Sequence, residues 1–127
     1  MPLIEFPYTL HKGYLLPIIP ITILGHRVWV FVDSGAALTI LSIDDAHRMG
    51  IDWQTGRQQM IVVGDGSFIP TYFHDLSILI DQWELIAPIG FSERLGVGFN
   101  ILGRKGIFDQ FQVCFNDRTR KVTFQKI

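Results

Sequence analysis

The sequence predicts an all-β fold, closed or sandwich-like, with one or two short helices. Three observations support this prediction. Short runs rich in β-branched and aromatic residues recur along the chain, glycine-containing turns separate them, and helix-capping signals bound only a short segment. A length of 127 residues suits a single domain, which we expect to span residues 1–127, and 48% apolar residues suffice for a core.

The first predicted hairpin joins residues 19–24, IPITIL, to residues 27–33, RVWVFVD. Both runs favour strands, and Gly25 with His26 forms a plausible turn between them. The pattern then changes to that of a helix.

Ser42 and Asp45 have the spacing of a capping box, and Gly50 stands where a C-terminal cap belongs. A helix of about two turns is therefore expected from residue 43. Further on, residues 58–73 predict a second hairpin with a glycine-rich tip at residues 64–66. The remaining predicted elements are two strands, one helical turn or short helix, and a closing hairpin, at residues 75–80, 83–91, 104–111 and 111–127, the last turning at residues 116–118.

Composition and charge exclude several kinds of partner. The formal net charge is -1, and neither nucleic acid nor a membrane surface is expected as a partner. The four histidines lack metal-ligand spacing, so we expect no metal and no other cofactor. Cys114 lies in the alternating run FQVCF, which favours a buried structural thiol over a nucleophile. Without a signal peptide, a membrane span or disulfides, a cytoplasmic protein is expected.

The stretch VWVFVDSGAALTILS, residues 28–42, places one carboxylate among large apolar side chains. Burying an unpaired charge is costly, so the position of Asp33 needs a reason. Asp followed by Ser or Thr and then Gly occurs by chance in about one chain in twenty of this length, so the tripeptide alone is weak evidence. A simple turn is usually polar on both sides, whereas WVFV and AALTIL flank this one. The context therefore favours a functional carboxylate.

Three segments, in this order, resemble the aspartic proteases. FVDSGAALTILS resembles the catalytic segment with its apolar-apolar-Asp-Thr/Ser-Gly-Ala motif, and VVGDGSFIP occupies the place of the glycine-tipped flap. FNILGRKGIFDQFQVCFND resembles the apolar-apolar-Gly segment that packs beside the catalytic loop, and its ILGR matches the retroviral members. The resemblance covers most of residues 18–124. It implies the single lobe of the acid-protease (retropepsin) fold, a closed, β-barrel-like structure.

The resemblance also implies an aspartic endopeptidase in which two carboxylates share one proton and activate a water. This chain has one Asp-Ser/Thr-Gly motif, so the second carboxylate has to come from a second copy. We therefore expect a homodimer in which two Asp33 side chains meet across a two-fold axis and act on a peptide or protein substrate.

Roles are carried over from the family residue by residue. The catalytic segment is Asp33, Ser34 and Gly35. The residues expected to bind substrate lie in the catalytic loop, the flap and the downstream segment, namely Ala36, Val63, Gly64, Asp65, Gly66, Ser67 and Ile101. The residues expected to support the catalytic loop are Leu102, Gly103 and Arg104. At the flap tip, Asp65 is either a turn former or a specificity element.

The chain departs from the retroviral pattern in two places. Ala37 stands where retroviral members usually have an aspartate that pairs with the arginine of the GR motif, so Arg104 either finds another partner or stays solvated. The tail after Gly103 is longer than the retroviral ending, and the dimer sheet is then built differently, with VTFQKI or PLIEF as candidate strands.

Two alternatives to an autonomous enzyme stay open. One is a non-catalytic retropepsin-fold dimer that binds an extended peptide, and the other is a regulated protease that needs activation or a dedicated partner.

Overall fold

Strands make up most of the chain, and the described residues contain one α-helix and one 3₁₀-helix between them. The computed structural model describes residues 3–96 and 98–127. In chain order the elements are β1 Leu3–Pro7, β2 Thr9–His11, β3 Tyr14–Leu16, β4 Ile18–Ile23, β5 His26–Val32, β6 Thr39–Ser42, α1 Ile43–Arg48, η1 Trp53–Thr55, β7 Arg57–Val62, β8 Phe68–Ile80, β9 Trp83–Ser92, β10 Ile101–Leu102, β11 Phe111–Asn116 and β12 Lys121–Lys126. The predicted all-β class with short helices is confirmed.

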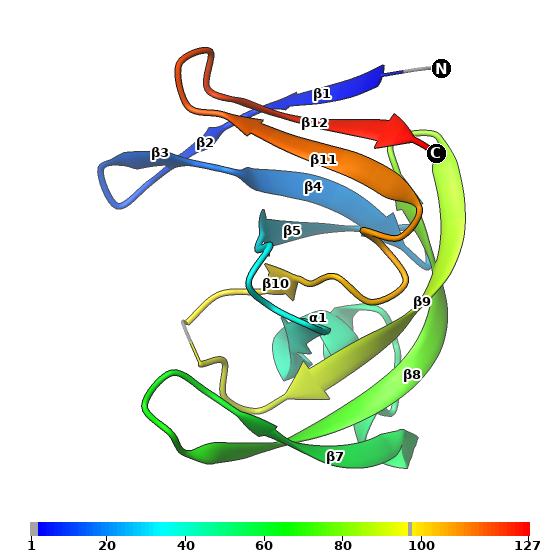
Figure 1. The fold of residues 1–127 in the computed structure, drawn as a ribbon. Helices are drawn as coiled ribbons and strands as arrows, with labels where there is room; N and C mark the ends of the chain where they lie inside the picture. Colours follow the sequence, from blue (N-terminus) through cyan, green and yellow to red (C-terminus); the bar gives the residue numbers. More distant parts are fainter. Residues whose placement is uncertain (1–2, 97) are drawn as a thin grey trace.

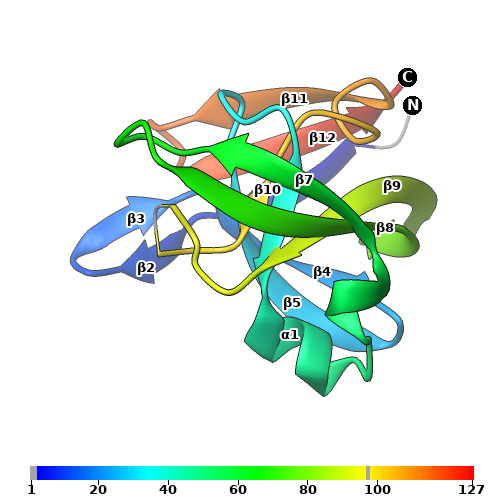
Figure 2. The same ribbon diagram turned by 90° about the horizontal axis from the view of Figure 1, so that it is seen from below.

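A ring of hydrogen-bonded strands forms the body of the molecule. The order is β4-β5-β10-β6-β9-β8, and β4 closes the ring by pairing with β8. Strand β7 pairs with β8 beyond the ring, and the two form a hairpin whose tip projects to one side (Figure 1). Figure 2 shows the same hairpin arching across the molecule, with α1 on the opposite side from β11 and β12. The ring therefore confirms the closed, barrel-like lobe.

The N-terminal strand and the closing hairpin form a separate three-stranded sheet in the order β1-β12-β11. This sheet lies over β4 and β5, and the two chain ends are close together in both views (Figures 1 and 2). Strand β12 pairs on both sides, so VTFQKI has no free edge within its own chain. PLIEF supplies the edge strand β1, apart from Pro2, which lies outside the described residues.

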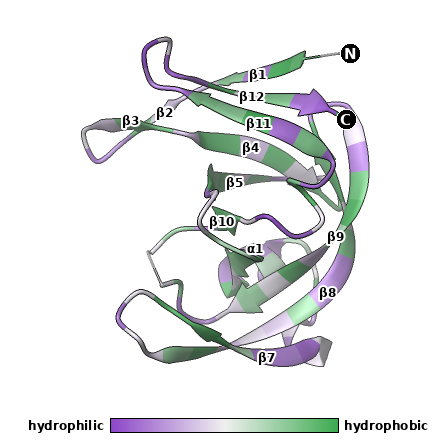
Figure 3. Cartoon of the chain, viewed as in Figure 1, coloured by the Kyte–Doolittle hydropathy of each residue, from purple (hydrophilic) through white to green (hydrophobic). Residues whose placement is uncertain are grey.

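Alternating apolar side chains explain the centre of the core. Strands β4 and β5 each direct every second residue inward, as β-branched residues do on a half-buried strand. Their inward side chains are at most 1% exposed, namely Ile19, Ile21, Ile23, Val28, Val30 and Val32. Phe111 and Phe124 of the three-stranded sheet belong to the same hydrophobic cluster, so this sheet packs onto the ring. Figure 3 shows apolar colouring over most of β4 and β5.

The first hairpin turns one residue earlier than predicted. Ile23 pairs with His26, so the two loop residues are Leu24 and Gly25 rather than Gly25 and His26. Both loop residues have positive φ, 49° and 77°. A two-residue hairpin of this kind requires positive φ at both positions, and glycine reaches it without strain.

Two later predictions also shift in detail. The runs 68–73 and 75–80 form one continuous strand, β8, instead of two. In the closing hairpin Asn116 pairs with Lys121, so the loop is residues 117–120 and not 116–118. The Asn116 side-chain oxygen accepts hydrogen bonds from two amides of that loop, which places Asn116 at its start.

The capping signals correctly place the helix. The Ser42 Oγ accepts a hydrogen bond from the Asp45 amide at 3.3 Å, and α1 ends at Arg48 with Met49 as its C-cap, followed by Gly50 with φ 74°. The segment at residues 104–111 forms hydrogen-bonded turns and no helix: the Phe108 amide donates to the Arg104 carbonyl at 2.9 Å, and the Gln110 amide donates to the Ile107 carbonyl at 3.0 Å.

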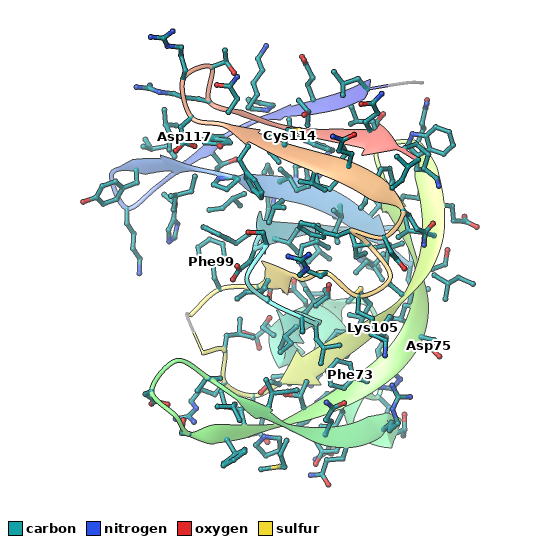
Figure 4. All side chains as sticks on the ribbon, in the orientation of Figure 1. Phe73, Asp75, Phe99, Lys105, Cys114 and Asp117 are labelled. Atoms are coloured by element: carbon teal, nitrogen blue, oxygen red, sulfur yellow. The ribbon has the colours of Figure 1, made fainter. Side chains whose placement is uncertain are left out.

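Cys114 is exposed, so the prediction of a buried thiol is wrong. Along β11, Phe111 is buried and Val113 is half-buried, while Cys114 falls on the opposite face. Because side chains alternate along a strand, the core contact of Phe111 and Val113 directs the thiol outward. Figure 4 shows Cys114 on the three-stranded sheet.

Candidate active site

A tight loop after β5 carries Asp33 and leads into β6. Asp33 is half-buried, and the Gly35 amide donates to its Oδ1 at 2.9 Å. The Ala36 amide donates to the Asp33 carbonyl at 3.2 Å, which closes the turn. A Cβ on Gly35 would lie 3.3 Å from the same carboxylate oxygen, a tight contact. The loop therefore orients the carboxylate through its own backbone, and a small residue at position 35 gives it room.

Strand β10 lies between β5 and β6 and forms hydrogen bonds with this loop. It runs parallel to β5 and antiparallel to β6. The Asp33 amide donates to the Leu102 carbonyl at 3.0 Å, and the Gly103 amide donates to Thr39 Oγ1 at 2.9 Å. The Arg104 amide donates to the Ala36 carbonyl at 2.9 Å. The structure thus brings the three expected support residues into contact with the loop.

Arg104 has a partner within its own chain. Its Nη1 donates to the Ser34 carbonyl at 2.9 Å, and its guanidinium lies 5.8 Å from the centre of the Phe108 ring. The Ser34 residue itself is exposed. Where retroviral members have a carboxylate, this chain places Ala37, whose carbonyl accepts a hydrogen bond from the Lys105 amide. A backbone carbonyl therefore takes the place of an acidic partner for Arg104.

A cleft of about 490 Å³ lies between the Asp33 loop, the β7–β8 hairpin and the segment after β9. Six of the residues predicted to act in the site line it, namely Asp33, Gly35, Ala36, Val63, Gly64 and Ile101. The other lining residues are mostly apolar and were missed from the sequence, namely Ala37, Leu38, Ile40, Ile61, Val62, Ile69, Thr71, Arg94, Leu95, Gly96 and Phe99. The cleft is thus lined mostly by apolar residues, with Asp33 in its wall.

The tip of the β7–β8 hairpin, residues 63–67, is a tightly bonded turn. The Val63 amide donates to the Ser67 carbonyl at 3.0 Å, and the Gly66 amide donates to the Val63 carbonyl at 2.8 Å. The Ser67 hydroxyl and amide donate to Asp65 Oδ1 at 2.5 and 2.9 Å. These two hydrogen bonds hold the pKa of Asp65 below its usual value. Asp65, Gly66 and Ser67 form the tip beyond the lining residues, and Asp65 stabilises the turn.

Phe99 forms part of the cleft wall. Its ring lies 4.5 Å from the His11 ring, centre to centre, in an edge-to-face arrangement. Figure 4 shows Phe99 on the side towards which the flap tip and the β2–β3 hairpin project. The N-terminal hairpin therefore supports one wall of the cleft.

Asn100 is a structural residue of the site that the sequence analysis missed. Its side-chain oxygen accepts from the Ser42 amide at 2.9 Å, and its Nδ2 donates to the Trp29 carbonyl at 3.0 Å and to Asp45 Oδ2 at 2.7 Å. One amide thus links β5, β6 and α1 directly before β10. The signal was slight, since only a polar residue within an apolar segment marks the position.

Asp45 is the buried acidic member of this network. Burial alone would raise the pKa of Asp45, but hydrogen bonds from Arg48, Asn100 and Ser42 outweigh it and hold that pKa below its usual value. The network therefore fixes α1 against the strands that carry the Asp33 loop.

Within residues 3–96 and 98–127, no helix has the length and apolar character to cross a membrane. In the same part of the chain, no three His, Cys, Asp or Glu side chains are grouped so that they could hold a metal ion.

Comparisons with solved structures bear on the fold. A retropepsin-like aspartic protease from Rickettsia conorii superposes with a TM-score of 0.74 and 16% identity, over 97% of this chain and 98% of that one. The EIAV protease in complex with the inhibitor HBY-793 superposes with a TM-score of 0.57 and 18% identity, over 76% of this chain and 88% of that one. The fold is therefore retropepsin-like.

Sequence comparison gives the family. Among curated proteins, none matches this chain. The profile of a family described as aspartyl protease matches residues 19–85, which is more than half of the 127 residues and includes the Asp33 loop and the flap. The chain belongs to the aspartyl protease family.

Proposed function

We propose that the protein is a homodimeric aspartic endopeptidase with an Asp33 carboxylate contributed by each subunit. The observation that carries this proposal is the position of Asp33, in the wall of an apolar cleft, beneath a hairpin flap and on a loop bonded to β10. Since the chain contains one Asp-Ser/Thr-Gly motif, the second carboxylate comes from the partner subunit across a two-fold axis.

The chemistry requires the two carboxylates to share one proton, because two like charges in contact cannot both ionise. The ionised carboxylate takes a proton from a water, and the resulting hydroxide oxygen attacks the scissile carbonyl carbon. The protonated carboxylate donates a hydrogen bond to the carbonyl oxygen, and a proton passes to the leaving nitrogen as the C–N bond breaks. The pair titrates as a unit, so the two pKa values belong to the dimer and not to either residue.

The residues of each subunit would bind and orient the peptide. The Gly35 amide fixes one oxygen of Asp33, so the carboxylate is held in position before the substrate arrives. The flap presents extended backbone to an extended peptide and excludes water from the cleft. Apolar lining residues such as Ile40, Ile61 and Ile69 favour apolar substrate side chains near the scissile bond.

The test is cleavage of a mixed peptide library by the wild-type protein and by Asp33→Asn. We expect the variant to lose cleavage while keeping its circular dichroism spectrum and its sedimentation behaviour. Asp75→Asn is the matched control, because Asp75 is exposed and points away from the body of the molecule (Figure 4). Cleavage that survives in Asp33→Asn rules out the assignment.

Two further outcomes separate the alternatives. A wild-type dimer that binds peptides without cleaving them supports the non-catalytic or regulated form. A strict monomer at micromolar concentration contradicts autonomous catalysis, because one subunit supplies a single motif carboxylate.

A further inference from the structure

Arg94, directly after β9, is fixed beside the tip of the flap. Its amide lies 3.3 Å from the buried Ser92 Oγ and donates to it, and the Ser92 hydroxyl donates to the Arg94 carbonyl at 2.9 Å. Ser92 is 1% exposed, so the main chain at Arg94 is anchored to the core. The side chain of Arg94 reaches the flap, where its Nη2 donates to Ser67 Oγ at 3.3 Å.

The contact with Ser67 extends to a carboxylate. The Ser67 hydroxyl accepts from Arg94 and donates to Asp65 Oδ1, so it bridges the guanidinium and the carboxylate. Hydrogen bonds from Ser67 lower the pKa of Asp65, and the positive charge of Arg94 acts in the same direction. The acidic flap tip therefore faces a cation on the cleft wall.

The flap tip and the segment after β9 also touch through a second, apolar contact. A Cβ built on Gly96 would lie 2.8 Å from Val63 Cγ1, so the flap side chain packs directly on the glycine backbone. The flap tip thus touches the segment after β9 through an apolar contact at Val63 and a polar contact at Ser67. Only the polar contact depends on charge.

We propose that Arg94 is a positioning residue that holds the flap tip over the cleft, through Ser67 and Asp65 of the same subunit. The proposal rests on the proposed peptidase function, in which the flap covers a bound peptide. Because Arg94 and Asp65 are exposed and Ser67 is half-buried, salt screens the interaction between Arg94 and the flap tip, and its effect is modest. The interaction of Arg94 with the flap tip favours the flap conformation that covers the cleft. Without it, the flap would sample more conformations, and the substrate would bind only to the fraction that covers the cleft.

The experiment compares the wild type with Arg94→Met, Arg94→Lys, Asp65→Asn and the double variant Arg94→Met with Asp65→Asn. Amide hydrogen exchange of residues 62–68, measured from milliseconds to minutes, reports flap mobility without any need for catalysis. The KM for a cleaved peptide reports the effect on substrate. Arg57→Met is the matched control, because Arg57 begins the same hairpin at the end away from the tip.

We expect Arg94→Met to speed exchange in residues 62–68 and to raise KM by about two- to fivefold, with a smaller change in kcat. Arg94→Lys recovers part of both effects because it keeps the charge. The double variant behaves like the single ones, since either change breaks the same interaction. High salt reduces the difference between the wild type and Arg94→Met, and Arg57→Met behaves like the wild type.

Unchanged flap exchange in Arg94→Met overturns the inference, whatever the catalytic result. Additive effects in the double variant also overturn it, because independent residues do not share one interaction. If no peptide is cleaved, the proposed function fails, and hydrogen exchange still decides whether Arg94 holds the flap.

Discussion

Replacing Gly103 with alanine tests how tightly β10 supports the Asp33 loop. Gly103 is buried, and a Cβ on it would lie 2.2 Å from the Leu38 carbonyl oxygen, 2.4 Å from the Leu38 carbonyl carbon and 2.8 Å from its nitrogen. All three atoms belong to the backbone, so no change of rotamer relieves the clash. The loop that runs from Asp33 to Leu38 has to move away from β10 instead.

The expected loss in the free energy of unfolding of Gly103→Ala has two contributions. Forcing a methyl group into a packed site costs about 1–3 kcal/mol. Moving the loop also stretches the bond from the Gly103 amide to Thr39 Oγ1, and a buried donor left without its acceptor costs about 1–3 kcal/mol. Together they predict a loss of about 2–6 kcal/mol, which lowers Tm by roughly 6–30 °C at about 3–5 °C per kcal/mol for a domain of this size.

The assay is thermal and urea unfolding at a fixed protein concentration, because the stability of the proposed dimer would depend on concentration. Gly64→Ala is the matched control, since a Cβ on Gly64 meets nothing within 4 Å. We expect the control to unfold at or slightly above the wild-type temperature. If Gly103→Ala unfolds within 0.5 kcal/mol of the wild type, taking about 0.5 kcal/mol as the scatter of surface substitutions, the steric argument is refuted.

Two further predictions concern other parts of the chain. Asp45→Asn should lower the free energy of unfolding at pH 7, and the difference from the wild type should shrink as the pH falls below about 3.8. The reason is that a carboxylate whose pKa is lower in the folded than in the unfolded state stabilises the fold at pH values above the unfolded pKa, and this stabilisation is lost as the carboxylate is protonated. Urea titrations from pH 7 to pH 3 measure the difference in unfolding free energy, and a difference that does not change with pH contradicts the prediction. Cys114 should react with a thiol reagent in the native protein, and Cys114→Ser should change the unfolding free energy by less than about 0.5 kcal/mol; a thiol that reacts only in denaturant contradicts the exposed position.

Local chemistry explains why the sequence predicted the main elements. The Ser42 and Asp45 spacing specified a helix because the cap is made within four residues of chain. The flap tip was equally local, since Asp65 and Gly66 form their turn with immediate neighbours. Such features depend on residues close in sequence, so a single chain reveals them.

Long-range pairing explains what was missed. Asn100 joins segments 55 to 71 residues apart, and no local pattern marks it. Arg94 and Phe99 reach the cleft only because the strand ring closes and brings the segment after β9 beneath the flap. The error at Cys114 has a related cause, because an alternating run does not say which of its two faces is turned inward.

The pairing of the two chain ends limits how a second copy of the chain could add a strand to the three-stranded sheet of β1, β12 and β11. Strand β12 is hydrogen-bonded to β1 on one side and to β11 on the other, so its backbone groups are already paired. A strand added to this sheet therefore has to use the outer edge of β1 or of β11. On β1 the ladder is short, because Pro7 at its end has no amide to donate. Since one chain completes the three-stranded sheet by itself, the proposed dimer would not be needed to form this sheet, and the proposed contact between the two Asp33 loops would be a separate requirement.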